Sequence, residues 1–372
     1  MKTSEKAFKF AKALVTGTLD FEYSGTPCRL EHASWKKLLT VARTQVNCSR
    51  AKPSKPWYPV QLHVETSAVC SLHCPLCPAG MGLTGTNRSI MPFATFRDLM
   101  DEVGDYTLSA LMWGWGEPLL NPKLADMIDY ACGKNVVTVV STNGQWLRSE
   151  DDAERLVSAG LDCLIVSMDG ATQDVYSRYR VGGEVERVTR CLELIRDAKT
   201  RLRSHKPVVN VQTVVLKHNE HELAQIADTA HRCGAELVTR VSSHMPDYAG
   251  QDADERFAPD DERYRRFEYG DGKRLRRSAT EYACIRPWDR MTVTWDGTVI
   301  ACEHDFKCTL PLGRGGNGGS FLDAWWGEPA SELRRQLLLD KTVYPFCNDC
   351  HYRDNKQQCL VDVLRPEPMR AQ

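Results

Sequence analysis

Short apolar runs alternate with amphipathic stretches along the first two thirds of the chain. Val and Ile are frequent in several of the runs, which predicts strands at residues 61–65, 108–113, 136–140, 163–167, 208–216 and 235–241. The stretches between them have helical spacing, and four end at or just before a glycine; they cover residues 92–104, 122–133, 150–160, 184–199 and 220–234. This alternation predicts a parallel α/β fold, either an open doubly wound sheet or a partial barrel.

The pattern stops after Val241. Residues 244–278 are polar and highly charged, which predicts a connecting segment with a short helix over Glu262–Tyr269. Further on, Met291–Trp295 and Thr298–Ala301 flank an Asp-Gly pair, which predicts a hairpin with a type I′ turn. We therefore expect an N-terminal helical extension (1–57), a barrel (58–245), a charged linker (246–283) and a small cysteine-rich domain (284–372).

Composition narrows the class of protein. The 372 residues include 48 basic and 49 acidic side chains, so the balance does not favour a nucleic-acid partner. No apolar run approaches the length of a membrane span, and the N-terminus lacks a signal peptide pattern, so we expect a cytoplasmic protein without a membrane partner. Fifteen cysteines in such a chain indicate metal binding more than disulfides.

Three of these cysteines directly follow the first predicted strand. Cys70, Cys74 and Cys77 are spaced C-x3-C-x2-C. A [4Fe–4S] cube normally takes four thiolates, so three leave one iron open to a chelating small molecule. Zinc is the alternative, with His73 as a fourth ligand, but His73 is adjacent to Cys74, which is awkward for one tetrahedral site.

Polar motifs follow the next three predicted strands. They are Gly-Trp-Gly-Glu-Pro at 114–118, Ser-Thr-Asn-Gly at 141–144 and Ser-Met-Asp-Gly at 167–170. Tight turns and helix caps would explain each motif without any ligand. In a barrel, however, the C-terminal ends of the strands form the catalytic face, so these motifs would surround one site.

The cysteine motif resembles the signature of the radical S-adenosylmethionine superfamily. One departure is Leu76, where the family usually has an aromatic residue. The resemblance implies a partial (β/α)6 TIM-like barrel over Gln61–Val241, open on one side. It also implies that the open iron binds S-adenosylmethionine, and that one electron, from reduced flavodoxin or ferredoxin, cleaves this cofactor to a 5′-deoxyadenosyl radical.

The resemblance also implies roles for the polar motifs. Residues 114–118 resemble the family segment that binds the amino group of the cofactor, which would assign Gly114, Gly116 and Glu117 to that group. By the same resemblance Ser141 and Asn143 would lie near the ribose, and Ser167 and Asp169 near the cofactor or substrate. Arg180 is a candidate partner for a carboxylate, although a surface arginine is an equal alternative.

A second group of cysteines lies in the C-terminal region. On spacing alone Cys284, Cys302, Cys347 and Cys350 could hold zinc or an iron–sulfur cluster. The pattern resembles the SPASM and twitch modules, and Lys356 stands where SPASM has a further cysteine. We therefore expect a twitch-like module with one auxiliary [4Fe–4S] cluster and no second one, and leave open that Cys308 or Cys359 replaces a ligand.

The reaction expected from this resemblance is hydrogen abstraction from an unactivated C–H bond. The substrate radical would then be oxidised or epimerised, with Cys308 and Cys359 as candidate hydrogen donors. We expect a small polar substrate, such as a sugar or aminocyclitol of an antibiotic pathway. The alternatives are a SPASM-type maturase of a ribosomal peptide or protein, and a binding protein stabilised by zinc.

Overall fold

The computed structural model describes most of the chain. The described residues are 12–48, 55–85, 87–242, 255–270, 273–276, 284–340, 342–348, 350 and 362–364. Within them, no helix is both long and apolar enough to cross a bilayer.

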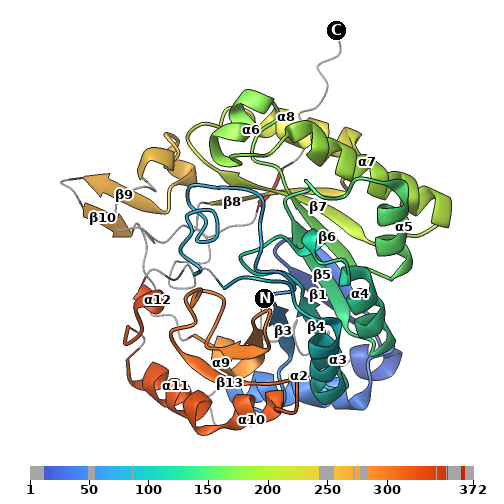
Figure 1. The fold of residues 1–372 in the computed structure, drawn as a ribbon, viewed down its shortest axis with the longest axis vertical. Helices are drawn as coiled ribbons and strands as arrows, with labels where there is room; N and C mark the ends of the chain where they lie inside the picture. The colour runs from blue at the N-terminus through green and yellow to red at the C-terminus, as the bar shows by residue number, and fades with distance from the viewer. Residues whose placement is uncertain are drawn as a thin grey trace.

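A mostly parallel ten-stranded sheet forms the centre of the molecule (Figure 1). Six consecutive strands confirm the prediction: β3 (Gln61–Val64), β4 (Ser109–Leu111), β5 (Val137–Thr142), β6 (Cys163–Ser167), β7 (Val208–Val215) and β8 (Leu237–Ser242). Each of them pairs in parallel with the next. The predicted α/β fold is thus present, and the sheet is consistent with a partial barrel.

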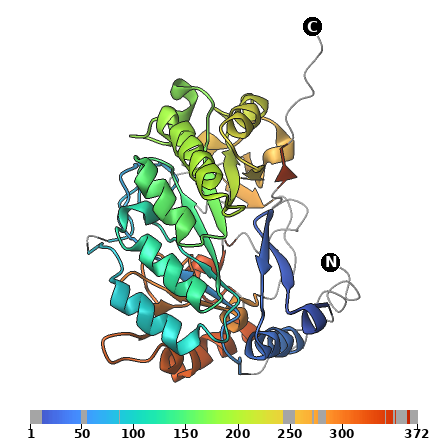
Figure 2. The same cartoon turned by 90° about the vertical axis from the view of Figure 1, so that its right-hand side faces the viewer.

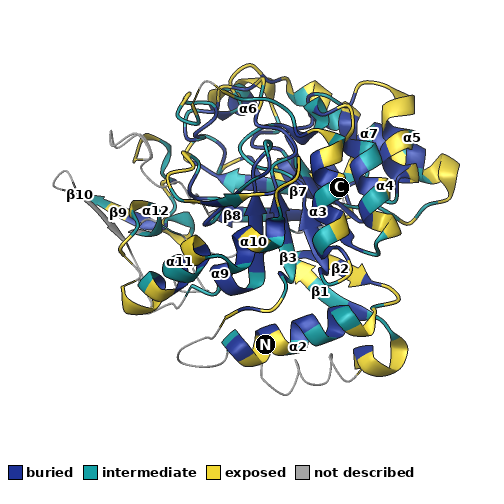
Figure 3. Cartoon of the chain, turned by 60° about the horizontal axis from the view of Figure 1, so that its bottom comes forward, coloured by how far each residue is buried: buried dark blue, intermediate teal, exposed yellow. Residues whose placement is uncertain are grey.

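The five predicted helices cover one face of this sheet (Figure 1). They are α3 (Phe93–Val103), α4 (Leu124–Gly133), α5 (Glu150–Ser158), α7 (Val185–Leu202) and α8 (Leu223–Arg232). Each buries one apolar stripe, such as Phe96, Leu99 and Met100 of α3, and exposes its opposite face (Figure 3). A sixth helix, α6 (Gln173–Tyr179), was not predicted because it has only seven residues.

The N-terminal extension packs on the opposite face of the sheet (Figure 2). It contains α2 (Trp35–Cys48) and a hairpin of β1 (Leu19–Tyr23) and β2 (Thr26–Leu30), which the sequence analysis did not predict. Cys28 and Leu30 join a buried cluster with Val139 and Ile165, whose side chains alternate with those that face the helices. The hairpin therefore fills the inner side of the sheet.

The C-terminal region extends the same sheet. It contains α9 (Arg286–Asp289), β11 (Arg290–Val293), β12 (Thr298–Ile300), β13 (Pro311–Arg314), α10 (Phe321–Trp326), α11 (Glu328–Leu339) and α12 (Pro345–Asn348). Strand β11 pairs in parallel with β3, from Arg290 opposite Gln61 to Val293 opposite Val64. The cysteine-rich region is thus joined to the edge of the barrel by main-chain hydrogen bonds.

The predicted hairpin is confirmed, but its turn type is wrong. Thr294 N donates to Thr298 O at 2.9 Å, and Gly297 N donates to Thr294 O at 3.0 Å, so three residues form the loop. Only Gly297 has a positive φ, of 88°, whereas a type I′ turn needs positive φ at two positions. The Asp296 carboxylate stabilises this wider loop by accepting from Thr298 N and Thr294 Oγ1.

The helix predicted over Glu262–Tyr269 is also wrong. A single 3₁₀ turn, η3 (Glu262–Tyr264), is followed by β9 (Phe267–Gly270), which pairs with β10 (Lys273–Arg276). Before them, η2 (Glu255–Phe257) is another single turn. At the other edge of the main sheet, β14 (Asp362–Val363) pairs with β8.

Candidate active site

The loop after β3 carries the first three cysteines. Its main chain is held from two sides, because Glu117 N donates to Val69 O at 2.7 Å and His73 N donates to Val181 O at 2.9 Å. Cys74 is buried, with 5% of its surface exposed, and it packs with the half-buried Cys70 and Cys77 in one cluster. The structure thus places the three thiols together at the C-terminal end of the first barrel strand.

Polar donors point at two of these thiols. Asn143 Nδ2 lies 3.7 Å from Cys70 Sγ, and Arg180 Nη1 lies 4.0 Å from Cys74 Sγ. Burial raises the pKa of Cys74 to about 12, and the nearby Arg180 guanidinium opposes this shift. An amide and a guanidinium next to buried thiols would stabilise thiolate charge, so this donor set fits an iron–sulfur cluster.

The Glu117 side chain connects two neighbouring segments of the site by hydrogen bonds. Its buried carboxylate accepts hydrogen bonds from Leu119 N at 3.0 Å, Thr142 Oγ1 at 2.6 Å and Asn143 N at 2.8 Å. Burial raises the pKa of Glu117 above its usual value, and these three donors oppose the shift. The side chain therefore joins the loops after β4 and β5; its role toward the amino group of the cofactor stays a prediction.

Asp169 and Arg180 form a buried ion pair. Arg180 Nε lies 2.5 Å from Asp169 Oδ2, and the other oxygen of Asp169 accepts from Val214 N at 2.7 Å. Asp169 is fully buried and the Arg180 side chain is 15% exposed, so Arg180 is not a surface residue. The pair holds the guanidinium beside Cys74. The contact of Arg180 with a substrate or cofactor carboxylate stays a prediction.

The remaining predicted cofactor residues lie on neighbouring strands. Ser141 is in β5 and Ser167 ends β6, and both side chains are partly exposed. Gly116 lies so close to Ser67 O that an added Cβ would come within 2.3 Å of it. Sequence reasoning missed Trp146, whose Nε1 donates to Ser71 Oγ at 2.9 Å and holds the cysteine loop; no local pattern marks such a contact.

Three of the four predicted auxiliary cysteines lie close together. Burial, followed by the charges of Glu303 and Cys350, raises the pKa of Cys302 well above its usual value, and Cys284 adds to the same shift. Cys350 N donates to Cys347 O at 3.3 Å, so the two cysteines of the C-x2-C pair are joined by a main-chain hydrogen bond. The described residues contain no group that would hold a single metal ion.

Of the two candidate hydrogen donors, Cys308 and Cys359, only Cys308 lies in the described part of the chain. Cys308 is exposed and has a positive φ of 51°, and its N–H donates to Asp305 O at 2.9 Å. Cys359 lies outside the described residues.

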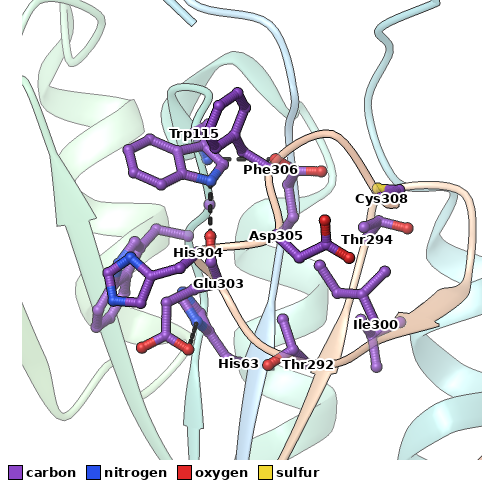
Figure 4. A pocket seen from close by; sticks show the side chains of 14 residues that line it. His63, Trp115, Thr292, Thr294, Ile300, Glu303, His304, Asp305, Phe306 and Cys308 are labelled. Atoms are coloured by element: carbon purple, nitrogen blue, oxygen red, sulfur yellow. Dashed lines mark hydrogen bonds and ion pairs between the residues drawn. The ribbon is translucent and has the colours of Figure 1, made fainter. Parts of the chain in front are cut away.

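A direct contact joins the two cysteine-bearing regions. Trp115, in the loop after β4, donates from Nε1 to Glu303 O at 2.9 Å, one residue after Cys302. Its ring meets Phe306 edge to face, with centroids 6.0 Å apart (Figure 4). The sequence showed Trp115 inside the candidate cofactor motif but could not show what its ring touches, because that contact is made across the fold.

Comparison with known proteins decides the family. Residues 64–230 match the family model of the radical SAM superfamily, and residues 284–351 match that of an iron–sulfur cluster-binding domain, SPASM. The chain is a radical SAM protein with a C-terminal SPASM domain. These two domains imply a [4Fe–4S] cluster, S-adenosylmethionine and an auxiliary iron–sulfur cluster. The twitch-like form of the second domain stays a prediction.

Curated relatives of this radical SAM protein include maturation and synthesis enzymes. Mycofactocin maturase of Mycobacterium ulcerans is 29% identical over 54% of this chain and 52% of its own length. The AdoMet-dependent heme synthase of Methanosarcina barkeri is 28% identical, over 54% of each chain. The chain thus spans about half of these two relatives. A tungsten-containing aldehyde ferredoxin oxidoreductase cofactor-modifying protein of Pyrococcus furiosus is 24% identical over 79% of this chain and 87% of its own.

Solved structures share the fold. SuiB of Streptococcus suis, solved with S-adenosylmethionine and also with its precursor peptide SuiA, has a TM-score of 0.57, with 94% of this chain and 81% of its own covered. BtrN in complex with AdoMet and 2-DOIA has a TM-score of 0.51, with 83% and 100% covered. Their identities, 14% and 16%, show a common fold alone.

Proposed function

We propose that this radical SAM enzyme is a maturase that modifies a ribosomally made peptide or protein. The observation that carries the proposal is the docking of the SPASM domain on the barrel. Strand β11 extends the barrel sheet at β3, and the loop after Cys302 accepts a hydrogen bond from Trp115 of the candidate cofactor loop at 2.9 Å. A substrate at the mouth of the barrel would therefore be in contact with both domains.

The relatives favour a peptide over the small sugar that we expected from the sequence. The Mycobacterium ulcerans relative is named a maturase, and the Pyrococcus furiosus relative is named a cofactor-modifying protein. The match to the Pyrococcus furiosus protein extends over 79% of this chain. The fold itself does not decide, because SuiB and BtrN share it with substrates as different as a precursor peptide and 2-DOIA.

Within this proposal each predicted residue keeps a defined role. Cys70, Cys74 and Cys77 would hold the first cluster, which, once reduced by flavodoxin or ferredoxin, would supply the electron for cleavage of the cofactor. The cofactor would lie against Gly114, Gly116, Glu117, Ser141 and Asn143, with Ser167, Asp169 and Arg180 around it. The auxiliary cluster would be bound by Cys284, Cys302, Cys347 and Cys350.

Anaerobic reconstitution tests the proposal. With dithionite and S-adenosylmethionine, the wild type should form 5′-deoxyadenosine, and a candidate precursor peptide added to the reaction should change mass. The Cys70→Ala/Cys74→Ala/Cys77→Ala variant should form none, because no thiolate remains to hold the first cluster. Cleavage by this variant would remove the assignment of the site, and turnover of a sugar but of no peptide would return the substrate to our first expectation.

A further inference from the structure

A cavity of about 170 Å³ lies between the barrel and the SPASM domain. The C-terminal ends of β3 and β4 form one side of it, and the hairpin β11–β12 with the loop after Cys302 forms the other (Figure 4). The lining residues that matter here are His63, Glu65, Trp113, Trp115, Glu303 and Phe306. Because both domains contribute, the docked SPASM domain completes the cavity.

The wall of this cavity holds buried polar atoms that make no hydrogen bond to the described residues. Among the described residues, neither ring nitrogen of His63 nor Oε2 of Glu303 has a hydrogen-bond partner. His63 Nδ1 and Glu303 Oε2 lie 3.8 Å apart, which is an ion-pair distance when the imidazole is protonated but is longer than a hydrogen bond (Figure 4). Buried polar atoms left unpaired are unfavourable, and a donor group in the cavity would pair with the Glu303 oxygen and with the unprotonated ring nitrogen of His63.

The charges around the cavity favour a cation. Glu303 is already balanced, because Arg290 Nη1 lies 3.0 Å from its Oε1. Glu65 accepts only main-chain N–H groups, from Trp115 at 3.2 Å and Trp295 at 3.5 Å, and no ion pair to it occurs within the described ranges. Burial raises the pKa of Glu65 to about 7, the direction expected of a carboxylate without a counter-charge.

Aromatic rings form the apolar part of the wall. Trp115 and Phe306 meet at 74°, and Trp113 lies 5.4 Å from the His63 ring between centroids. Aromatic faces attract ammonium and guanidinium groups, and they also cover the methylene stem of a long side chain. The cavity is next to the candidate cofactor loop, since Gly114 and Trp115 line it and Glu117, two residues on, is hydrogen-bonded to Val69 beside Cys70.

We infer that this cavity is a pocket for a basic side chain, lysine or arginine, of the peptide substrate. Its ammonium or guanidinium N–H groups are recognised by Glu65, Glu303 and His63, and its stem lies between the tryptophan rings. The inference deepens the proposed function and rests on it for the nature of the substrate. The pocket would fix one residue of the peptide next to the cofactor loop.

Binding of short peptides to the full-length, anaerobically reconstituted protein tests the pocket without turnover. The probes are acetyl-Ala-Lys-Ala-amide and acetyl-Ala-Arg-Ala-amide, with acetyl-Ala-norleucine-Ala-amide as the uncharged control, and affinity is measured by saturation-transfer NMR titration. We expect the lysine and arginine probes to bind about tenfold more tightly than the norleucine probe, since only they pair with Glu65.

Two variants locate the effect. Glu65→Gln keeps an amide oxygen for Trp115 N–H but removes the charge, and it should lower the affinity of both basic probes about tenfold without changing that of norleucine. Glu186→Gln, an exposed carboxylate in the first turn of α7, should change neither. Equal affinity for all three probes, or equal loss in both variants, would overturn the pocket. The 5′-deoxyadenosine assay is read separately, so a failed proposed function would not be confused with a failed pocket.

Discussion

At the residue scale, the site depends on buried charges that hold one another in place. The three cysteines could be predicted because their spacing is local and specific. The contacts around them could not, because Glu117 reaches Thr142 and Asn143, and Arg180 reaches Asp169, only after the strands have assembled. The motifs thus predict which residues lie at the mouth of the barrel, but they do not predict which side chains hydrogen-bond one loop to another.

The Asp169–Arg180 pair should be a strong determinant of stability. Arg180→Met leaves the fully buried Asp169 carboxylate without its cation, which should lower the free energy of unfolding by about 3–5 kcal/mol in urea denaturation of the cluster-free protein. Arg187→Met, which breaks the exposed pair with Glu184, should cost about 1 kcal/mol or less.

Charge burial, and not loss of packing, is the reason for this expectation. The double variant Asp169→Asn/Arg180→Met removes the orphaned carboxylate and should therefore recover part of the stability lost in Arg180→Met. If Arg180→Met behaves like Arg187→Met, the pair has no structural role and the guanidinium serves a ligand alone.

At the element scale, the prediction was good where the pattern is periodic and poor where tertiary contacts decide. Strand β6 was predicted with the bounds observed, since four apolar residues precede Ser167 and Asp162 and Asp169 flank the run. The hairpin β1–β2 was missed because polar residues interrupt it and Pro27 lies inside β2, although Pro27 pairs with Glu22 at an edge. Its stability comes from burial of Cys28 and Leu30 against the sheet, which no local window contains.

Helix α10 should depend on a residue of another domain. Ser320 caps the helix locally, but Glu102 of α3 accepts from Phe321 N at 3.2 Å, Leu322 N at 3.1 Å and Ser320 Oγ at 2.9 Å. Glu102→Ala should therefore cost about 1 kcal/mol of local stability at the start of α10, because it leaves helix N–H groups unpaired and removes an anion from the positive end of the helix.

Hydrogen–deuterium exchange measures this effect where it occurs. Peptides that cover residues 320–326 should exchange faster in Glu102→Ala. Asp98→Ala, on the same helix and ion-paired with Arg97, should leave them unchanged. Unchanged exchange in both variants would show that the SPASM domain docks without this contact.

At the scale of the whole molecule, the SPASM domain is part of the barrel sheet. Predicting two domains in order was possible from the cysteine spacings. The parallel pairing of β11 with β3 was not, because it joins strands far apart in the chain, and either strand alone is compatible with many partners. This pairing brings the loop after Cys302 to Trp115, and it accounts for the cavity that the two domains share.

The same arrangement predicts which cysteines hold the auxiliary cluster. After burial, which is the largest cause, the Cys350 thiol helps to raise the pKa of both Cys284 and Cys302, so these three thiols lie near one another. Cys308, by contrast, is exposed on the wall of the cavity beside Glu65. Reconstituted wild type should contain about eight irons, and Cys302→Ala or Cys350→Ala about four, because a cube needs its thiolates. Cys308→Ala should keep about eight.

Iron content and spectra together distinguish the two sites. Cys302→Ala should retain the change in the electron paramagnetic resonance signal on addition of S-adenosylmethionine, because that signal comes from the cluster on Cys70, Cys74 and Cys77, which is held by separate loops. If Cys308→Ala lost about four irons and Cys350→Ala kept about eight, the fourth ligand of the auxiliary cluster would be Cys308 in place of Cys350. Cys308 could then no longer act as a hydrogen donor, because its thiol would be committed to iron.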